Sequence, residues 1–179
     1  NMSCRIYMDH AATTEMLPEV REAMEPYLRE EYGNASTSYD MGVRMHDAIE
    51  EAREKIAWVI DAQPEEIFFT SGGSESDNWV IKSVAGEKKN SGKHLITTRI
   101  EHHAVLRSCQ YLESLGYEVT YLDVDDYGLV SAKEVVHALR EDTTLVSVMT
   151  GNNEIGTIEP IADIGAQLRA RGIAFHTDA

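Results

Sequence analysis

Cysteine and long apolar runs are scarce in this sequence. Cys4 and Cys109 are the two cysteines in 179 residues, too few for a disulfide framework, and no C-x-x-C motif or Cys/His cluster indicates a zinc or other metal site. No apolar run approaches the length of a membrane span, and the N-terminal segment lacks the basic start and apolar core of a secretory signal. The sequence therefore predicts a cytoplasmic protein with no membrane partner. Cys109 occupies an apolar position of a helical pattern and is expected to be a buried structural thiol.

Basic residues are also few. Lysine and arginine number 16 against 31 aspartates and glutamates, which gives a formal net charge of -15. A nucleic-acid surface needs clustered basic side chains to displace counterions, so no nucleic-acid partner is expected. The acidic residues fall mostly on helical faces, which is typical of a solvated surface. The hydrophobic content of 42% is ordinary for a folded globular domain.

Short apolar runs alternate with amphipathic stretches along the whole chain. This alternation predicts an α/β fold with a mostly parallel sheet, right-handed crossovers and helices on both faces. Helices are expected at 18–32, 43–62, 74–86, 103–116, 131–140 and 160–172. Strands are expected at CRIYMD (4–9), EEIFFT (65–70), HLITT (94–98), YEVTYLDV (117–124), LVSVM (145–149) and IAFHT (173–177).

Ligands of open parallel sheets collect beyond the carboxyl ends of the strands. The first such exit is FFTSGGSESDNW. Gly72 and Gly73 permit close backbone approach, and Ser74 falls where a helix N-terminus would offer N–H groups and a hydroxyl to an anion. The stretch matches neither of the standard nucleotide-binding glycine motifs, and a glycine turn with a serine cap would also explain it. The residues at the other strand exits distinguish between these two interpretations.

Three later exits carry polar side chains suited to the same ligand. His102 begins a helix, where it is either a surface histidine or a ring that stacks on a flat cofactor. Asn152 and Asn153 follow the next strand, and at least one of them could serve only the turn. Asp178 follows the last strand, where it is either a helix cap or a carboxylate facing a pyridine nitrogen. Together the four exits indicate a site for a phosphorylated pyridine.

Six motifs resemble the N-terminal half of cysteine desulfurases, in the class V aminotransferase group of pyridoxal-phosphate enzymes. They occur in the family's order along the chain. The resemblance implies that residues 1–16 form an N-terminal arm and residues 17–179 the N-terminal part of the cofactor-binding large domain. The motifs are MDHAATT (8–14), YGNAS (32–36), FTSGGSESDN (69–78), EHHAVL (101–106), NNEIGT (152–157) and HTDA (176–179).

The resemblance also implies roles for individual residues around pyridoxal 5'-phosphate. Gly73 and Ser74 would hold the phosphate, and His102 would stack on the ring and help proton transfer. Asn153 would contact the phenolic oxygen and Asp178 the ring nitrogen. In the family's asparagine loop, Asn34 would lie near the substrate carboxylate.

The implied reaction takes sulfur from L-cysteine as an enzyme persulfide and leaves L-alanine, and the sulfur would pass to acceptor proteins for iron-sulfur cluster or thio-cofactor assembly. The family's Schiff-base lysine and persulfide cysteine come later than the HTDA motif, so both are expected outside these 179 residues. A homodimer is implied. Two alternatives stay open: another class V enzyme, such as a selenocysteine lyase or an aminotransferase, and a non-catalytic half-protein acting as a scaffold.

Overall fold

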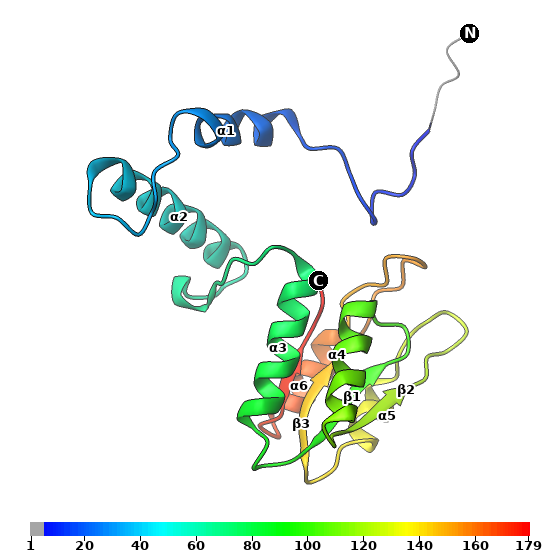
Figure 1. Cartoon of the computed structure of the whole chain (residues 1–179). Coiled ribbons are helices and arrows are strands. Elements are labelled where there is room, and N and C mark those ends of the chain that lie inside the picture. Colours follow the sequence, from blue (N-terminus) through cyan, green and yellow to red (C-terminus); the bar gives the residue numbers. More distant parts are fainter. Residues whose placement is uncertain (1–5) are drawn as a thin grey trace. The chain divides into compact units, whose positions relative to one another are not determined.

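The computed structural model describes residues 6–179. These residues divide into two compact units. The first, here called the helical unit, ends at Phe69, and the second, the α/β unit, spans Thr70–Ala179. Figure 1 shows the elements of both units in the order of the chain. None of the helices among the described residues is long and apolar enough to cross a lipid bilayer.

The helical unit contains α1 (Pro18–Arg29), α2 (Asp40–Val59) and a 3-10 turn, η1 (Pro64–Glu66). Proline suits the first turn of α1 because its fixed φ matches the helix and that position needs no backbone donor. The loop between the helices is held by Asn34, whose side-chain oxygen accepts a hydrogen bond from the Ser36 N–H at 2.9 Å. Asn34 is therefore a turn residue of this unit as well as a candidate for ligand contact.

Two strands expected from the sequence are absent from the described residues 6–179. The prediction at CRIYMD is wrong for residues 6–9, which have no regular structure, while residues 4 and 5 lie outside the described part of the chain. The prediction at EEIFFT is also wrong, because 64–66 is a 3-10 turn and 67–70 belongs to no strand. Ile67 does have extended backbone angles (φ -96°, ψ 123°). The apolar residues of this segment favour an extended backbone. A strand also needs backbone hydrogen bonds to a neighbouring strand, and composition does not specify these.

The α/β unit is a four-stranded, all-parallel sheet with the strand order β2-β1-β3-β4. It confirms the predicted fold class. The elements are α3 (Gly73–Glu87), β1 (His94–Thr98), α4 (His103–Ser114), β2 (Glu118–Leu122), α5 (Ala132–His137), β3 (Thr143–Ser147), α6 (Ile161–Arg169) and β4 (Ala174–His176). Each element overlaps a predicted segment, although α3 extends one residue beyond its predicted range at each end and β3 begins two residues earlier than expected.

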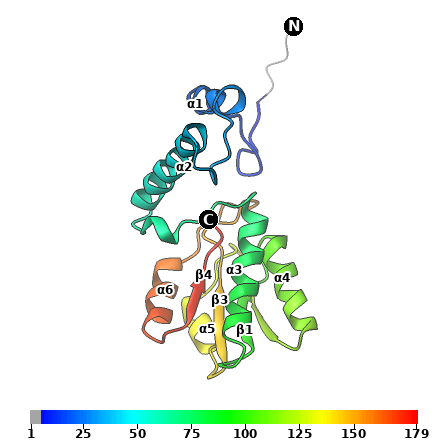
Figure 2. The ribbon, with the colours of Figure 1, turned by 60° about the vertical axis from the view of Figure 1, so that its left-hand side comes forward.

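Helices cover both faces of this sheet, and neighbouring residues of one strand serve different cores. Leu95 and Ile96 are both buried in β1 and point to opposite faces, because side chains alternate along a strand. Leu95 packs with α3 and α4, and Ile96 packs with α5 and α6. Figure 2 shows these helices on the two sides of the sheet. The first core comprises Ile81, Ala85, Leu95, Val105, Cys109, Leu112 and Leu145, and the second Ile96, Val130, Val135, Val146, Val148, Ile164 and Leu168.

Cys109 is a core residue, as the sequence predicted. It is buried in the α3–α4 side of the core, and this burial raises the pKa of its thiol to about 12. A thiol that stays protonated at neutral pH is a poor nucleophile. Cys109 is therefore a packing residue.

His94 joins three strands at the amino end of the sheet. Its Nδ1 lies 2.7 Å from Thr143 Oγ1 in β3, and its Nε2 lies 2.9 Å from Thr120 Oγ1 in β2. The ring is fully buried, and this burial lowers its pKa. The Thr120 hydroxyl depends on the ring for its hydrogen bond, whereas Thr143 Oγ1 also accepts a hydrogen bond from the Arg140 N–H at 2.7 Å.

Replacing His94 with alanine is expected to lower the free energy of unfolding by about 3 kcal/mol, through the cavity and the loss of the ring's hydrogen bonds to Thr120 and Thr143. The wild-type protein should also lose stability as pH falls below about 6.5, because only the unfolded state then binds a proton at this ring. The loss should approach about 1.4 kcal/mol per pH unit until the lower, native pKa is reached. Urea unfolding between about pH 5 and pH 8 measures both effects. An alanine variant with an unchanged pH slope would contradict the assignment to His94.

Candidate functional site

The strand exits that carry His102, Asn153 and Asp178 share one edge of the sheet, whereas the predicted exit before Gly73 and Ser74 follows no strand. β1, β3 and β4 run parallel and side by side, so their carboxyl ends lie together. From β1 the chain passes to β2 on one side, whereas β3 and β4 extend the sheet on the other. The strand order therefore reverses between β1 and β3. This is the point at which open α/β sheets bind ligands.

The glycine stretch before α3 forms a helix start with room in front of it. Gly72 caps the helix with φ 155°, in a region that other residues rarely adopt. Within the helix, the first backbone hydrogen bonds to the Gly72 carbonyl come from Glu75 and Ser76. The N–H groups of Gly73 and Ser74 thus point ahead of α3, as at any helix start. A Cβ built on Gly73 meets no atom within 4 Å, so there is open space beside these donors.

His102, Asp178 and a further carboxylate, that of Asp77, come together at this edge. One ligand atom from each lies within 4.8 Å of the others. His102 caps α4, and its Nδ1 accepts a hydrogen bond from the Ala104 N–H at 3.2 Å. Because Nδ1 accepts this hydrogen bond, the neutral His102 ring carries its proton on Nε2. Asp77 belongs to α3, one turn after Ser74 on the same side of the helix.

This group of side chains has unequal burial. Asp77 is 3% exposed, Asp178 is half-buried and His102 is exposed. Burial, followed by the neighbouring charge of Asp178, raises the pKa of Asp77 to about 6. Two carboxylates and an imidazole could also hold a divalent cation. The positive end of α3 lies one turn away, however, and it favours an anion over a cation.

Glu101 and Asn152 connect the exits of β1 and β3. The Oε1 atom of Glu101 accepts hydrogen bonds from the Thr98 hydroxyl at 2.7 Å and from the Met149 N–H at 3.0 Å. The Asn152 amide donates to the Ile100 carbonyl at 3.0 Å. Because Glu101 directly precedes His102, these bonds fix the start of α4 relative to β3. Both residues are positioning residues of the site.

Asn152 also holds its own turn. Its side-chain oxygen accepts hydrogen bonds from the N–H groups of Glu154 and Ile155 at 2.9 and 3.1 Å. This is the turn role that the sequence left open for one member of the asparagine pair. Asn153, the other member, is exposed in the same hairpin. The hairpin starts beside Asp178, whose carbonyl accepts a hydrogen bond from the Thr150 N–H at 2.8 Å.

Glu101 gives the protein a second pH dependence. Burial raises the pKa of its carboxyl to about 7, with Asp178 and Glu159 adding to the effect. Its Oε2 atom is buried without a hydrogen-bond partner in the described structure. The native state therefore keeps a proton that the unfolded chain releases near pH 4.3, so this stabilising contribution is present below that pH and lost as pH rises to about 7.

Replacing Glu101 with glutamine is expected to remove this loss, because the amide oxygen can still accept both hydrogen bonds and carries no charge. At about pH 8 the variant should be more stable than the wild type, by on the order of 2 kcal/mol, and at about pH 5 the two should differ little. Chemical unfolding at both pH values is the measurement. An equal difference in stability between the variant and the wild type at the two pH values would contradict the raised pKa of Glu101.

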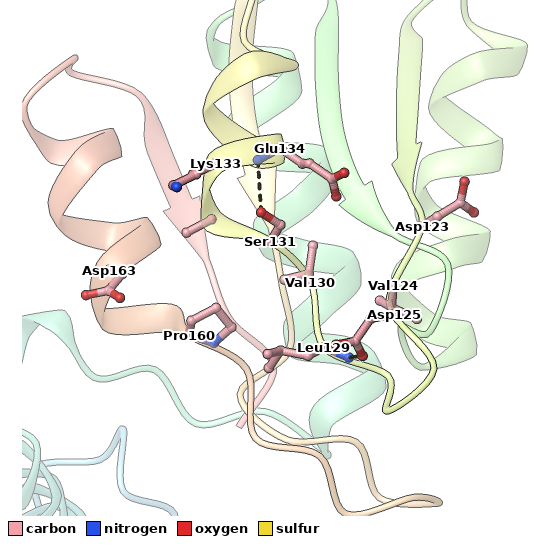
Figure 3. Close-up of a pocket in the computed structure, with 11 residues that line it drawn as sticks. Asp123, Val124, Asp125, Leu129, Val130, Ser131, Lys133, Glu134, Pro160 and Asp163 are labelled. Atoms are coloured by element: carbon pink, nitrogen blue, oxygen red, sulfur yellow. Dashed lines mark hydrogen bonds between the residues drawn. The ribbon is translucent and has the colours of Figure 1, made fainter.

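A separate hollow of about 660 Å³ opens on the α5–α6 side of the α/β unit. Figure 3 shows that acidic side chains surround it, with Lys133 among them. A dianionic phosphate would meet repulsion there. This hollow therefore does not compete with the α3 start as the anion site. Its acidic lining residues are Asp123, Asp125, Glu134 and Asp163.

The predicted site residues fall into three groups. His102 and Asp178 are brought together, and Gly73 and Ser74 begin the helix that supplies Asp77 to them. Asn153 lies in the hairpin after β3, and Asn34 belongs to the helical unit. Asp77 and the bridging role of Glu101 were missed from the sequence. A signal for Asp77 existed, because it shares the buried stripe of α3 with Ile81 and Ala85, where a carboxylate is unusual.

Comparison with known proteins gives consistent matches along the chain. Residues 6–179 match the family described as aminotransferase class-V. A cysteine desulfurase IscS of Methanosarcina thermophila is 53% identical over 97% of this chain and 43% of its own length. Two solved structures are also similar. A NifS-like protein has a TM-score of 0.94 and 42% identity over 98% of this chain, and SspA in complex with cysteine has a TM-score of 0.93 and 43% identity over 97%. The chain spans about half or less of the length of these relatives.

Proposed function

The chain belongs to the aminotransferase class-V family, and we propose that it is the N-terminal part of a pyridoxal-phosphate-dependent cysteine desulfurase. The observation that carries the proposal is the meeting of His102 and Asp178 at the edge of the sheet where α3 begins. A carboxylate, an exposed imidazole and a helix start suit the ring nitrogen, the ring face and the phosphate of this cofactor. The relatives named cysteine desulfurase IscS support this choice within the family.

The residues present fit pyridoxal 5'-phosphate in their chemistry. The N–H groups of Gly73 and Ser74 and the Ser74 hydroxyl would bind the phosphate, supported by the positive end of α3. Asp178 would hold the proton on the ring nitrogen. The bound cofactor would supply an electron sink for charge that develops at the α-carbon of the substrate. His102 would lie on the ring and move a proton at its Nε2 atom.

Asn153 and Asn34 would complete the contacts. The amide of Asn153 would donate to the phenolic oxygen, and Asn34 would bind the carboxylate of the substrate. Asn34 lies in the helical unit, so this assignment rests on its motif. The same proposal assigns residues 1–16 to an N-terminal arm and residues 17–179 to the N-terminal part of the cofactor-binding large domain. It also includes a homodimer.

L-Cysteine is the proposed substrate, with its sulfur passed to an enzyme cysteine and onward to acceptor proteins of iron-sulfur cluster or thio-cofactor assembly. The solved structure of SspA in complex with cysteine supports this substrate class, at 43% identity. The Schiff-base lysine and the persulfide cysteine would come from sequence outside these residues. A cytoplasmic location is part of this proposal.

The test uses the full-length protein loaded with pyridoxal 5'-phosphate. We expect equal amounts of L-alanine and sulfide from L-cysteine in the presence of a thiol reductant. Turnover of L-selenocysteine without turnover of L-cysteine would replace the proposal with a selenocysteine lyase, and amino transfer to a keto acid would replace it with an aminotransferase. Failure to bind the cofactor would favour the scaffold.

A further inference from the structure

Asp77 is a buried carboxylate that the proposed chemistry does not use. It lies in the first half of α3 and is 3% exposed. One of its carboxylate oxygens lies within 4.8 Å of a ring nitrogen of His102 and of a carboxylate oxygen of Asp178. Its Oδ1 also faces the Nε2 of His176 in β4 at 3.6 Å. The other ring nitrogen of His176 lies 2.9 Å from the Ser147 hydroxyl of β3. Asp77 is thus surrounded by polar groups from other elements of the α/β unit.

We propose that Asp77 is a second carboxylate of the ring-nitrogen subsite, which acts through Asp178 and couples binding of a protonated pyridine ring to release of a proton. This proposal rests on the proposed function and goes beyond it. Asp77 is a positioning residue in this role. It raises the negative charge around Asp178 and so favours the protonated ring nitrogen.

The charges around Asp77 explain the coupling. His102 comes from the start of α4, and His176 and Asp178 come from β4 and its exit. Glu101, at the exit of β1, acts on the same region through Asp178, and the hydroxyl that β3 contributes is neutral. Burial lowers the pKa of His176, so its ring is neutral near pH 7 and does not offset the two carboxylates.

With two carboxylates so close, one of them binds a proton more readily than usual. Burial and the charge of Asp178 raise the pKa of Asp77 to about 6. A pyridinium nitrogen placed at Asp178 adds a positive charge beside the pair and lowers that pKa again. Where Asp77 is protonated in the empty site, binding of the protonated ring therefore leaves Asp77 ionised and passes its proton to solvent. Atoms and charge balance without any further reactant.

The experiment uses the full-length protein freed of cofactor and titrated with pyridoxine 5'-phosphate. This probe keeps the ring and the phosphate but has no aldehyde, so it forms no bond to a lysine. Calorimetry at about pH 6 in two buffers of different ionisation enthalpy counts the protons released. The wild type should release up to about half a proton more than Asp77→Asn, because the variant has no carboxyl to ionise. At about pH 8 the variant should bind about tenfold more weakly, since only the charge effect then remains.

Controls separate this proposal from a purely structural role and from the proposed function. Glu87→Gln, at the exposed end of α3, should match the wild type in affinity and proton count. Equal proton counts for the wild type and Asp77→Asn would overturn the proposal, even if the affinity falls. A wild type that does not bind the probe would instead overturn the proposed function.

A second measurement covers the case in which Asp77→Asn does not fold. The ¹³C signal of the Asp77 carboxyl should titrate near pH 6 in the empty wild-type protein and at lower pH when the probe is bound. A midpoint that does not move on binding would contradict the coupling.

Discussion

Replacing Asp178 with alanine is expected to lower the rate of L-alanine formation from L-cysteine by about 10³-fold in the full-length protein. The half-buried carboxylate is proposed to hold a positive charge on the ring nitrogen. Removal of one preorganised electrostatic group of an active site typically costs 10²–10³-fold, or about 3–4 kcal/mol of barrier. Steady-state kinetics at saturating cofactor measures the effect, so that weaker cofactor binding does not enter.

Asp163→Ala is the matched control for this variant. Asp163 is an exposed acid in the first turn of α6, on the side of the α/β unit that carries the acidic hollow. The same loss of one negative charge there should leave the rate within about twofold, because exposed charges are well screened. If Asp178→Ala forms L-alanine at the wild-type rate, the proposed role of the Asp178 carboxylate is wrong.

Replacing Gly73 with aspartate is expected to weaken binding of pyridoxal 5'-phosphate by about 10²–10³-fold while the protein stays folded. A Cβ at this position meets no atom within 4 Å, and Gly73 has helical geometry as the first residue of α3. An acid in the first turn of a helix stabilises it by about 0.3–1 kcal/mol. The same carboxylate would repel a phosphate bound at the helix start, by several kcal/mol at a separation of about 5 Å. Cofactor titration should show the weaker binding, and thermal unfolding of the cofactor-free protein should show unchanged or slightly higher stability.

Gly86→Asp provides the corresponding control on the same helix. Gly86 lies in the last turn of α3, where a Cβ also meets open space. An acid there should leave cofactor affinity unchanged and slightly destabilise the protein, since it faces the negative end of the helix. If both variants bind the cofactor equally well, the phosphate is not held by the start of α3.

The sequence predicted the α/β unit well because its patterns are local. HLITT is β1 at the residues expected, and α5 lies within the predicted helix 131–140. EEIFFT failed because a strand depends on a neighbour that may lie anywhere in the chain. Propensity sets the local backbone, whereas pairing is decided by the whole fold.

The candidate site was predicted in part for the same reason. His102 and Asp178 lie just beyond the carboxyl ends of β1 and β4, so the shared edge of a parallel sheet brings them together. Asp77 lies inside a helix, where sequence position alone does not reveal what its side chain faces. Glu101 was visible as part of a polar loop, but its bonds to Thr98 and Met149 depend on the β1–β3 pairing. Residues that act across elements are therefore harder to find than residues at strand ends.

The order of the strands has a consequence during synthesis on the ribosome. β1 is translated before the other strands but lies between β2 and β3, and all five of its residues are buried in the finished sheet. At about 5–20 residues per second, β3 is complete about 2–10 s after β1. During that interval the nascent chain carries an unfinished central strand, so the emerging polypeptide is most vulnerable to aggregation before residue 147 has left the exit tunnel.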